Sequence, residues 1–230
     1  MFEDVPEDTN IYVTTATNGK VSSYACYYDQ FLATYLGDVY SIKWMENVDL
    51  NGTAESLEKQ FEIVKRETTT SPVQQYGDLS WDNEMISTFF GGQSASPQQP
   101  GKGCPDPDSV PTFDVPIAIL SKRISAAKDY NEKKKLEMKL NKELETRITV
   151  RSLFEKIAVA TVGNELGATE RALGTPMAAT QHDCRETVYK YFFKKCPHVE
   201  YTLKHVHVLS NLCEMGAYTD QIMNAINIAC

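Results

Sequence analysis

The chain has 230 residues, of which 42% are hydrophobic, and its net charge at pH 7 is −8. This length allows one large domain or two small ones, and the apolar content is enough to bury a core. No run of about 18 apolar residues occurs, which excludes a membrane-spanning helix. The acidic N-terminus, MFEDVPEDT, also lacks the apolar segment that a signal peptide needs.

Charge is distributed unevenly along the chain. Residues 1–120 carry 6 Lys and Arg against 18 Asp and Glu, a net charge of −12, whereas residues 121–230 carry 17 against 13, a net charge of +4. We therefore expect the acidic half and the basic half to dock on each other. In EKKKLEMKLNKELE the basic residues are interleaved with acidic ones, which is typical of a solvated helix face, so nucleic acid is not an expected partner.

The first predicted elements lie in the N-terminal forty-five residues. Residues 10–16, NIYVTTA, alternate in the manner of a half-buried strand. An aromatic loop is predicted over 22–38, SSYACYYDQFLATYLGD, and we expect it to form one wall of a substrate pocket. Residues 39–45 form either a short extended segment or the start of a helix.

A helix is predicted over 54–66, because three apolar residues of AESLEKQFEIVKR fall on one face and Thr53 can act as the N-cap. Residues 73–76 and 84–90 are predicted to be short extended segments. The first 116 residues thus offer few strands and one convincing helix, a poor complement for a covered sheet. We expect them to be the trailing part of a larger α/β domain.

A Pro-rich loop is predicted over 93–116, which holds six of the ten prolines, and the domain boundary should lie near its end. Beyond it the pattern becomes helical. Leu136, Leu140, Leu144 and Ile148 recur at every fourth residue, which predicts an amphipathic helix. Further helices are predicted over 151–161, 165–173, 184–195, 199–214 and 218–229. The predicted domains are 1–116, a linker with helices over 117–150, and an all-α domain over 151–230.

Four of the six cysteines lie in the last fifty residues or so: Cys184, Cys196, Cys213 and Cys230. Their spacing does not fit a zinc site. It indicates two disulfides, for which three connectivities are possible, and hence an oxidising compartment. The sequence Asn51-Gly52-Thr53 is a glycosylation acceptor and indicates the same compartment.

Several segments together resemble the legumain family, the asparaginyl endopeptidases: NIYVTTA, SSYACYYD, TYLGD, ESLEKQFEIVK, QYG and the four late cysteines. The resemblance runs along the whole chain apart from a variable stretch around 91–113. It implies a caspase-like α/β catalytic domain followed by an activation peptide and a helical, death-domain-like prodomain. It also implies a cysteine endopeptidase that cuts after Asn, and after Asp at acidic pH, in a lysosome or vacuole or as a secreted protein. No cofactor is implied.

Asparagine selectivity in legumains comes from the Asp of the Leu-Gly-Asp motif and the second Ser of the Ser-Ser-Tyr motif. The resemblance therefore implies that Asp38 and Ser23 contact the substrate, with Tyr24 beside the neighbouring subsite. A carboxylate suits this role because an Asn side chain offers two N–H donors. From the residues alone, Gly37-Asp38 could equally be a turn and Ser23 a strand end. Val39 stands where legumains often have Trp.

No catalytic residue is assigned, because the family's nucleophilic Cys and catalytic His would precede Met1. We expect a fragment that is inactive alone, and we expect Cys26 to be a buried free thiol. All four histidines lie in the helical tail. His205 and His207 would point about 200° apart on one helix and could not share an ion, so no metal site is expected.

The resemblance pairs Cys184 with Cys213 and Cys196 with Cys230, each disulfide contributing about 3 kcal/mol. It also indicates Asn131 as a self-processing site, the alternative being an ordinary solvated helix residue. The tail is expected to cover the active-site cleft as an inhibitory prodomain. The alternative function is that of a non-catalytic truncated product acting as a binding or inhibitory module.

Overall fold

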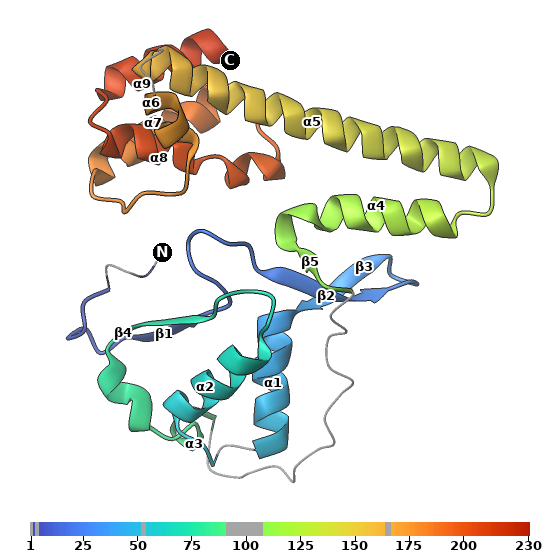
Figure 1. Ribbon diagram of the computed structural model, residues 1–230, viewed down its shortest axis with the longest axis vertical. Helices are drawn as coiled ribbons and strands as arrows, with labels where there is room; N and C mark the ends of the chain where they lie inside the picture. The colour runs from blue at the N-terminus through green and yellow to red at the C-terminus, as the bar shows by residue number, and fades with distance from the viewer. Residues whose placement is uncertain (1, 3–4, 52–53, 91–107, 164–166) are drawn as a thin grey trace. The chain divides into compact units, whose positions relative to one another are not determined.

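A computed structural model describes residues 2, 5–51, 54–90, 108–163 and 167–230 (Figure 1). The chain divides into two compact units, Met1–Ser125 and Ala126–Cys230, and each is described by itself. Among the described helices, none combines the length and the hydrophobicity that crossing a membrane requires.

Among its described residues, the first unit contains two small antiparallel sheets. One pairs β1 (Tyr12–Thr15) with β4 (Gln74–Gly77), which agrees with the extended segments predicted over 10–16 and 73–76. The other has the order β3-β2-β5, formed by β2 (Tyr24–Asp29), β3 (Thr34–Asp38) and β5 (Val110–Pro111). Gly77 sits beside Ile11 with a φ of +80°, and a side chain there would collide with the Ile11 carbonyl.

The prediction of a loop over 22–38 is wrong, because this stretch is a β-hairpin. Its aromatic residues pair across the strands, with Tyr28 opposite Tyr35 and their rings edge to face at 5.3 Å. The turn is closed by Asp29, whose Oδ1 accepts hydrogen bonds from the backbone N–H groups of Phe31 (2.8 Å) and Leu32 (2.7 Å). Aromatic residues suit a pleated strand as well as a loop, so composition alone did not separate the two.

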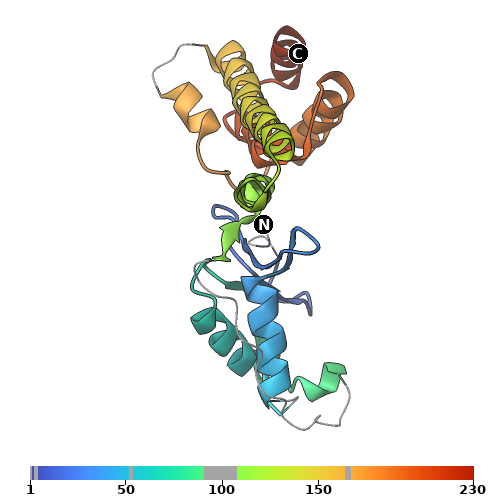
Figure 2. The same ribbon diagram turned by 90° about the vertical axis from the view of Figure 1, so that its right-hand side faces the viewer.

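Helices α1 (Val39–Asn51) and α2 (Leu57–Glu67) lie side by side in the first unit (Figures 1 and 2). Residues 39–45 therefore take the helical alternative. The predicted N-cap Thr53 lies outside the described residues; Ser56 caps α2 by accepting a hydrogen bond from the Lys59 N–H at 3.2 Å. The core of this unit is small and includes the fully buried Val73 and Ile86.

An extended segment over 84–90 was also a wrong prediction. A 3₁₀ helix, η1 (Leu79–Asn83), precedes a short α3 (Ser87–Phe90), and only the chain between them is extended. After the undescribed residues the chain forms β5, the 3₁₀ turn η3 (Thr112–Asp114) and α4 (Val115–Ala126).

Only helices occur among the described elements of the second unit. They are α5 (Tyr130–Val162), α6 (Ala168–Leu173), α7 (His182–Lys195), η4 (Glu200–Lys204), α8 (His207–Glu214) and α9 (Thr219–Ala229). The predicted helix over 199–214 is divided at His205 and Val206. The helix predicted over 151–161 is continuous with the one before it, so α5 runs through residue 150. The domain boundaries at 116 and 150 stay predictions.

The C-terminal half of α5 supplies the centre of this unit's core. Phe154 and Ile157 are fully buried against side chains from α7, α8 and α9. Figure 2 shows α5 between α6 on one side and α7 with α9 on the other. Phe192 is fully buried, and Tyr189, Tyr191 and Phe193 pack against the core.

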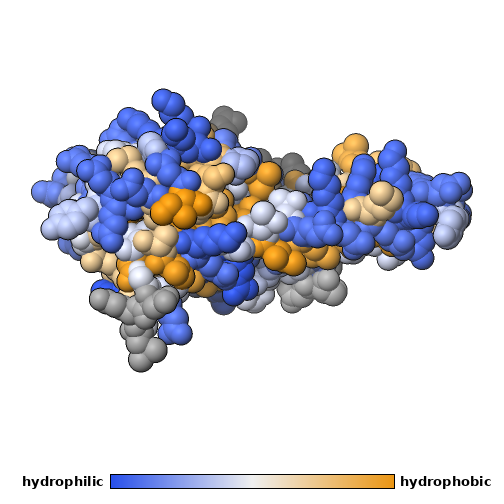
Figure 3. All heavy atoms as spheres, turned by 90° about the horizontal axis from the view of Figure 1, so that it is seen from above, coloured by the Kyte–Doolittle hydropathy of each residue, from blue (hydrophilic) through white to orange (hydrophobic). Residues whose placement is uncertain are grey.

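The four-residue leucine spacing did not predict one buried face of α5. Leu136 is buried, but Leu144 and Ile148 are 41% and 69% exposed. An α-helix has 3.6 residues per turn, so side chains repeated at every fourth residue move gradually around the helix and away from the face that packs on the core. On the face seen in Figure 3, hydrophilic side chains cover most of the N-terminal half of α5, and larger apolar patches appear nearer the bundle.

Candidate functional site

Ser23, Tyr24 and Asp38 are brought together at one end of the β2–β3 hairpin. Ser23 immediately precedes β2, Tyr24 is its first residue, and Asp38 is the last residue of β3. Asp38 lies directly opposite Ala25 in the register. Side chains alternate between the faces of a strand, so Asp38 and Ala25 share one face and Tyr24 belongs to the other.

Asp38 has a structural task in addition to any contact with substrate. Its Oδ1 accepts a hydrogen bond from the Ser41 N–H at 3.0 Å, at the N-terminus of α1. The turn interpretation of Gly37-Asp38 therefore describes this residue well. In the described part of the chain the cap uses only Oδ1, which leaves Oδ2 able to accept a hydrogen bond from a donor such as an Asn amide.

Close packing beside Asp38 fixes the position of this carboxylate. A Cβ at Gly37 would lie 3.0 Å from the Ile42 side chain, so a larger residue in the hairpin would require that side chain to shift. Behind it, the Tyr40 hydroxyl lies 2.6 Å from the Thr14 hydroxyl. Burial raises the pKa of Tyr40 against the effect of that hydrogen bond, and the charge of Asp38 raises it further.

The edge of β2 next to Ser23 is occupied by the chain's own β5. Tyr24 pairs with Pro111 and Ala25 with Val110, in the antiparallel sense. Thr112 continues the pairing: its N–H and its hydroxyl both donate to the Ser23 carbonyl at 2.9 Å, and its Oγ1 lies 3.0 Å from the Ser23 Oγ. This edge of the hairpin thus receives an extended peptide by strand addition.

An ion pair beside the hairpin holds the same segment. The Lys122 Nζ donates to Asp108 Oδ1 at 2.7 Å and lies 4.8 Å from the centre of the Tyr28 ring, while Asp108 Oδ2 accepts from the Tyr28 N–H at 2.9 Å. Burial would raise the pKa of Asp108, but the Lys122 ion pair and the Tyr28 N–H outweigh it and lower that pKa. The same ion pair raises the pKa of Lys122. Asp108, Thr112 and Lys122 were not predicted from the sequence, because they lie in or just after a stretch whose composition is typical of a linker.

Comparison with known proteins agrees with these motifs in both units. Residues 1–96 match the model of the peptidase C13 family, and residues 138–230 match the model of the legumain prodomain. The chain is 36% identical over 239 residues to legumain from Bos taurus, covering 100% of this chain and 54% of the relative.

The chain belongs to the legumain family of C13 peptidases.

More distant relatives in the family match over a similar span. The chain is 30% identical to hemoglobinase from Schistosoma japonicum, covering 98% of this chain and 54% of the relative. It is also 30% identical to the vacuolar-processing enzyme delta-isozyme from Arabidopsis thaliana, covering 100% of this chain and 54% of that relative. The chain therefore spans about half the length of the legumain-family proteins it matches.

The prediction that Cys26 is a free thiol is wrong, although the residue is fully buried as expected. Cys26 is disulfide-bonded, and no cysteine in the described part of this legumain-family chain is free. A thiolate nucleophile therefore cannot come from these cysteines. Cys104 lies outside the described residues.

The structure places His205 and His207 in separate elements. His205 is the residue after η4 and His207 begins α8, so the expectation that they share one helix is wrong. Within the described ranges no three His, Cys, Asp or Glu side chains gather in a group able to hold a metal ion.

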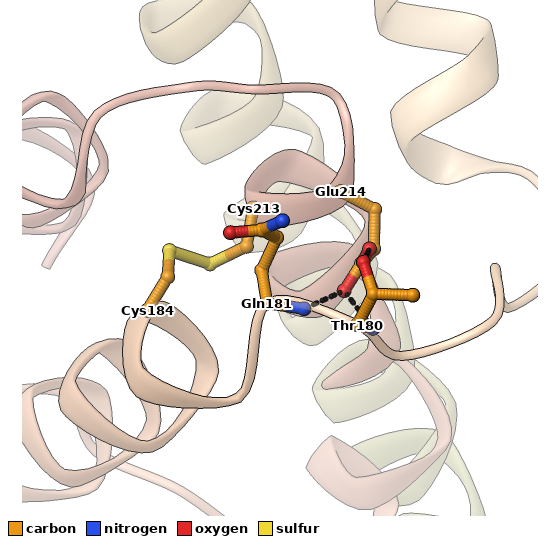
Figure 4. Close-up of a disulfide and its surroundings, with 5 residues drawn as sticks. All are labelled: Thr180, Gln181, Cys184, Cys213 and Glu214. Carbon is orange, nitrogen blue, oxygen red and sulfur yellow. Dashed lines mark hydrogen bonds between the residues drawn. A yellow bond between two sulfur atoms is a disulfide. The ribbon is translucent and has the colours of Figure 1, made fainter. Parts of the chain in front are cut away.

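The second unit contains both disulfides that the family resemblance implies, Cys184–Cys213 and Cys196–Cys230. Beside the first, the Glu214 carboxylate accepts hydrogen bonds from the N–H groups of Thr180 and Gln181, both at 2.8 Å, and from the Thr180 hydroxyl at 2.6 Å (Figure 4). Helix α7 has no side-chain cap of its own, and Glu214 from α8 satisfies the N–H groups just before it.

Two further predicted sites have less structural context. The side chain of Asn51 lies outside the described residues, as do Gly52 and Thr53. Asn131 is exposed in the first turn of α5, where Asp129 accepts the Glu132 N–H at 2.7 Å. A peptidase binds its substrate in an extended form, so cleavage after Asn131 would require this turn to open.

Proposed function

We propose that this chain is the asparagine-recognising and inhibitory part of a legumain-type cysteine endopeptidase that cuts after Asn, and after Asp at acidic pH. Ser23 and Asp38 contact the P1 side chain, the residue before the cut bond, and Tyr24 borders the next subsite. The catalytic Cys and His come from outside the residues of this chain. We further propose that the protein works in an acidic compartment such as a lysosome or vacuole. The name of one relative, the vacuolar-processing enzyme delta-isozyme, fits this proposal.

The observation that carries this proposal is the pairing of β5 with β2. It supports an edge beside Ser23 that accepts an extended peptide through main-chain hydrogen bonds, with Asp38 on the adjoining strand. Main-chain pairing gives affinity without regard to sequence, and a carboxylate at the pocket then selects a side chain with N–H donors.

Substitution of Asp38 in the full-length gene product tests the proposed pocket. We expect Asp38→Ala to lower kcat/KM for peptides with Asn at P1 by at least about a hundredfold relative to peptides with Ala at P1, because a site built for a donor loses its acceptor. Asp38 also caps α1, so Asp38→Ser, which can keep the cap, is the matched control for folding. Unchanged Asn selectivity in a folded Asp38→Ser enzyme would contradict the proposal.

The same segment supports an inhibitory role for this chain. As long as β5 and Thr112 occupy the edge beside Ser23, a substrate cannot pair there. We further propose that the basic tail is held by the acidic half at neutral pH and released when interface carboxylates take up protons. A proteolytically separated tail that stays bound at pH 4 and low salt would contradict this part.

The second candidate is a non-catalytic inhibitory module, and the occupation of the β2 edge by the chain's own β5 is the observation that supports it. Added to an active asparaginyl endopeptidase, the chain should then inhibit it in trans. In either case the chain alone should hydrolyse no Asn-containing peptide, and turnover above background would contradict both. Reading the coding sequence upstream of Met1 separates the two candidates: an open frame containing a Cys-Glu-Ser-Gly-Ser segment supports the peptidase.

A further inference from the structure

His205 lies at the junction of η4 and α8, against α5. Its ring centre is 5.9 Å from that of Phe154, a fully buried core residue of α5, and 5.4 Å from that of Tyr201 in η4. Its backbone joins the two helices, because its N–H donates to the Thr202 carbonyl and its carbonyl accepts from the Val208 N–H, both at 3.0 Å. The imidazole is therefore part of the packing between three elements.

His205 is partly buried, and the environment of its Nε2 suits only the neutral state of the imidazole. Nε2 is buried and has no hydrogen-bond partner among the described residues. An unpartnered buried nitrogen is tolerable on a neutral ring, but a protonated ring would place an N–H and a positive charge there without an acceptor.

The charges around His205 are mostly positive. Lys204 and His207 flank it in sequence, and Arg151 faces it from α5. Glu155, also on α5, is an acidic group that acts on it from the described part of the chain, and it is engaged with Arg151 at 3.0 Å. Arg147, also on α5, lies over the Tyr201 ring, 4.4 Å from its centre. Burial first, and then His207, Lys204 and Arg151, lower the pKa of His205 to about 4, against the opposing effect of Glu155.

We propose that His205 is an acid-sensitive packing residue of the helical unit, whose neutral ring holds η4 and α8 against α5 and whose protonation loosens that junction. This inference goes beyond the proposed peptidase function and does not depend on it. The helical unit would carry its own response to acid, in addition to any charge effect at its contact with the rest of the protein.

The direction follows from proton linkage. In the unfolded chain His205 has an ordinary pKa of about 6.5, above its value in the folded unit. The opened state therefore binds the proton first as the pH falls. The stabilisation from the neutral ring is fully present above pH 6.5 and is lost between pH 6.5 and 4. Over that range the equilibrium constant for opening the junction rises by at most about tenfold per pH unit. Between pH 7 and 4 the total increase in this equilibrium constant should approach a hundredfold.

Hydrogen exchange in the full chain measures this effect. We expect the amides of α8, after correction for the intrinsic pH dependence of exchange, to lose up to about a hundredfold more protection between pH 7 and 4 in the unmodified chain than in His205→Gln or His205→Phe. Acidic groups elsewhere contribute equally to all three proteins, so the difference isolates His205. His198→Gln, at an exposed histidine of the same unit, should behave like the unmodified chain.

The readout is the pH dependence of protection and not its absolute level, so a variant of lower stability still gives a result. If one variant fails to fold, the other is used, and an NMR titration of the His205 ring in the unmodified chain gives an independent answer. Equal pH dependence in the unmodified chain and the variants would overturn the proposal. So would a His205 ring that titrates near pH 6.5.

Discussion

Glu214 closes a loop that has little secondary structure of its own. The segment before α7 is held mainly from α8: the buried Asn211 donates to the carbonyls of Ala172 and Thr175, and Glu214 takes the N–H groups of Thr180 and Gln181. Burial would raise the pKa of Glu214, but the hydrogen bonds from Thr180 and Gln181 lower it. One carboxylate thus serves both as the tertiary cap of α7 and as the clamp of the loop.

Glu214→Gln should lower the free energy of unfolding of the helical unit by about 1 kcal/mol at pH 7, because charge-assisted hydrogen bonds become neutral ones. Since the pKa of Glu214 is lowered by folding, its stabilisation is present above the ordinary Glu pKa and is lost as the pH falls through the lowered value. The difference between variant and parent should therefore shrink at low pH. Urea unfolding followed by circular dichroism measures it.

Glu186→Gln is the matched control for this prediction. Glu186 is exposed on α7 and contacts Lys190 one turn away, so its loss should have no measurable effect. An equal effect of the two substitutions would show that Glu214 does not act as the cap of α7.

At the scale of elements, β5 is a strand of only two residues whose position depends on groups outside it. Strand pairing gives it direction, Thr112 extends the contact to Ser23, and the Asp108–Lys122 ion pair fixes the chain on both sides of it. Isolated, so short a strand would not be stable. Its attachment to β2 is therefore a property of the surrounding contacts.

Lys122→Met should weaken the attachment of β5 by roughly 1 kcal/mol, because it removes the ion pair and the contact with the Tyr28 ring while keeping an apolar stem of similar size. Faster hydrogen exchange at the Thr112 N–H, which donates to Ser23, would report the detachment. Lys122→Arg retains the charge and should behave like the parent chain. Unchanged protection of the Thr112 N–H in Lys122→Met would show that the ion pair does not hold β5.

At the scale of the whole chain, the two units differ in how they are stabilised. The second has a contiguous core around Phe154 and two disulfides, one of which ties the end of α7 to the last residue, Cys230. The first has two small sheets, few fully buried side chains and exposed apolar residues such as Leu36. We therefore expect the second unit to be the more stable of the two.

Removing a disulfide from the second unit should be costly. The bridges Cys184–Cys213 and Cys196–Cys230 close segments of 29 and 34 residues, so their loop-closure contributions should be alike. We expect Cys184→Ser with Cys213→Ser to lower the free energy of unfolding by about 3 kcal/mol, and the other double variant to do the same. Thermal unfolding of the helical unit measures this loss of stability, and an unchanged midpoint in either double variant would contradict the prediction.

The amino-acid sequence by itself was enough to predict what depends on local pattern and composition. Alternation predicted β1, the apolar face predicted α2, and periodicity predicted the helical character of the second half. Its motifs were sufficient for the family resemblance and, through it, for the disulfide pairing. These signals are local in the chain or carried by residue identity, so they can be read without coordinates.

The tertiary structure decided what depends on residues far apart in the chain. The aromatic stretch over 22–38 became a hairpin because its two halves pair, and Cys26 proved not to be free. Thr112 reached Ser23 across 89 residues. The Nε2 of His205 became buried without a hydrogen-bond partner among the described residues only where η4, α8 and α5 meet. Such contacts form when strands pair and helices pack, and a pattern read along one segment carries no information about which distant segment will complete it.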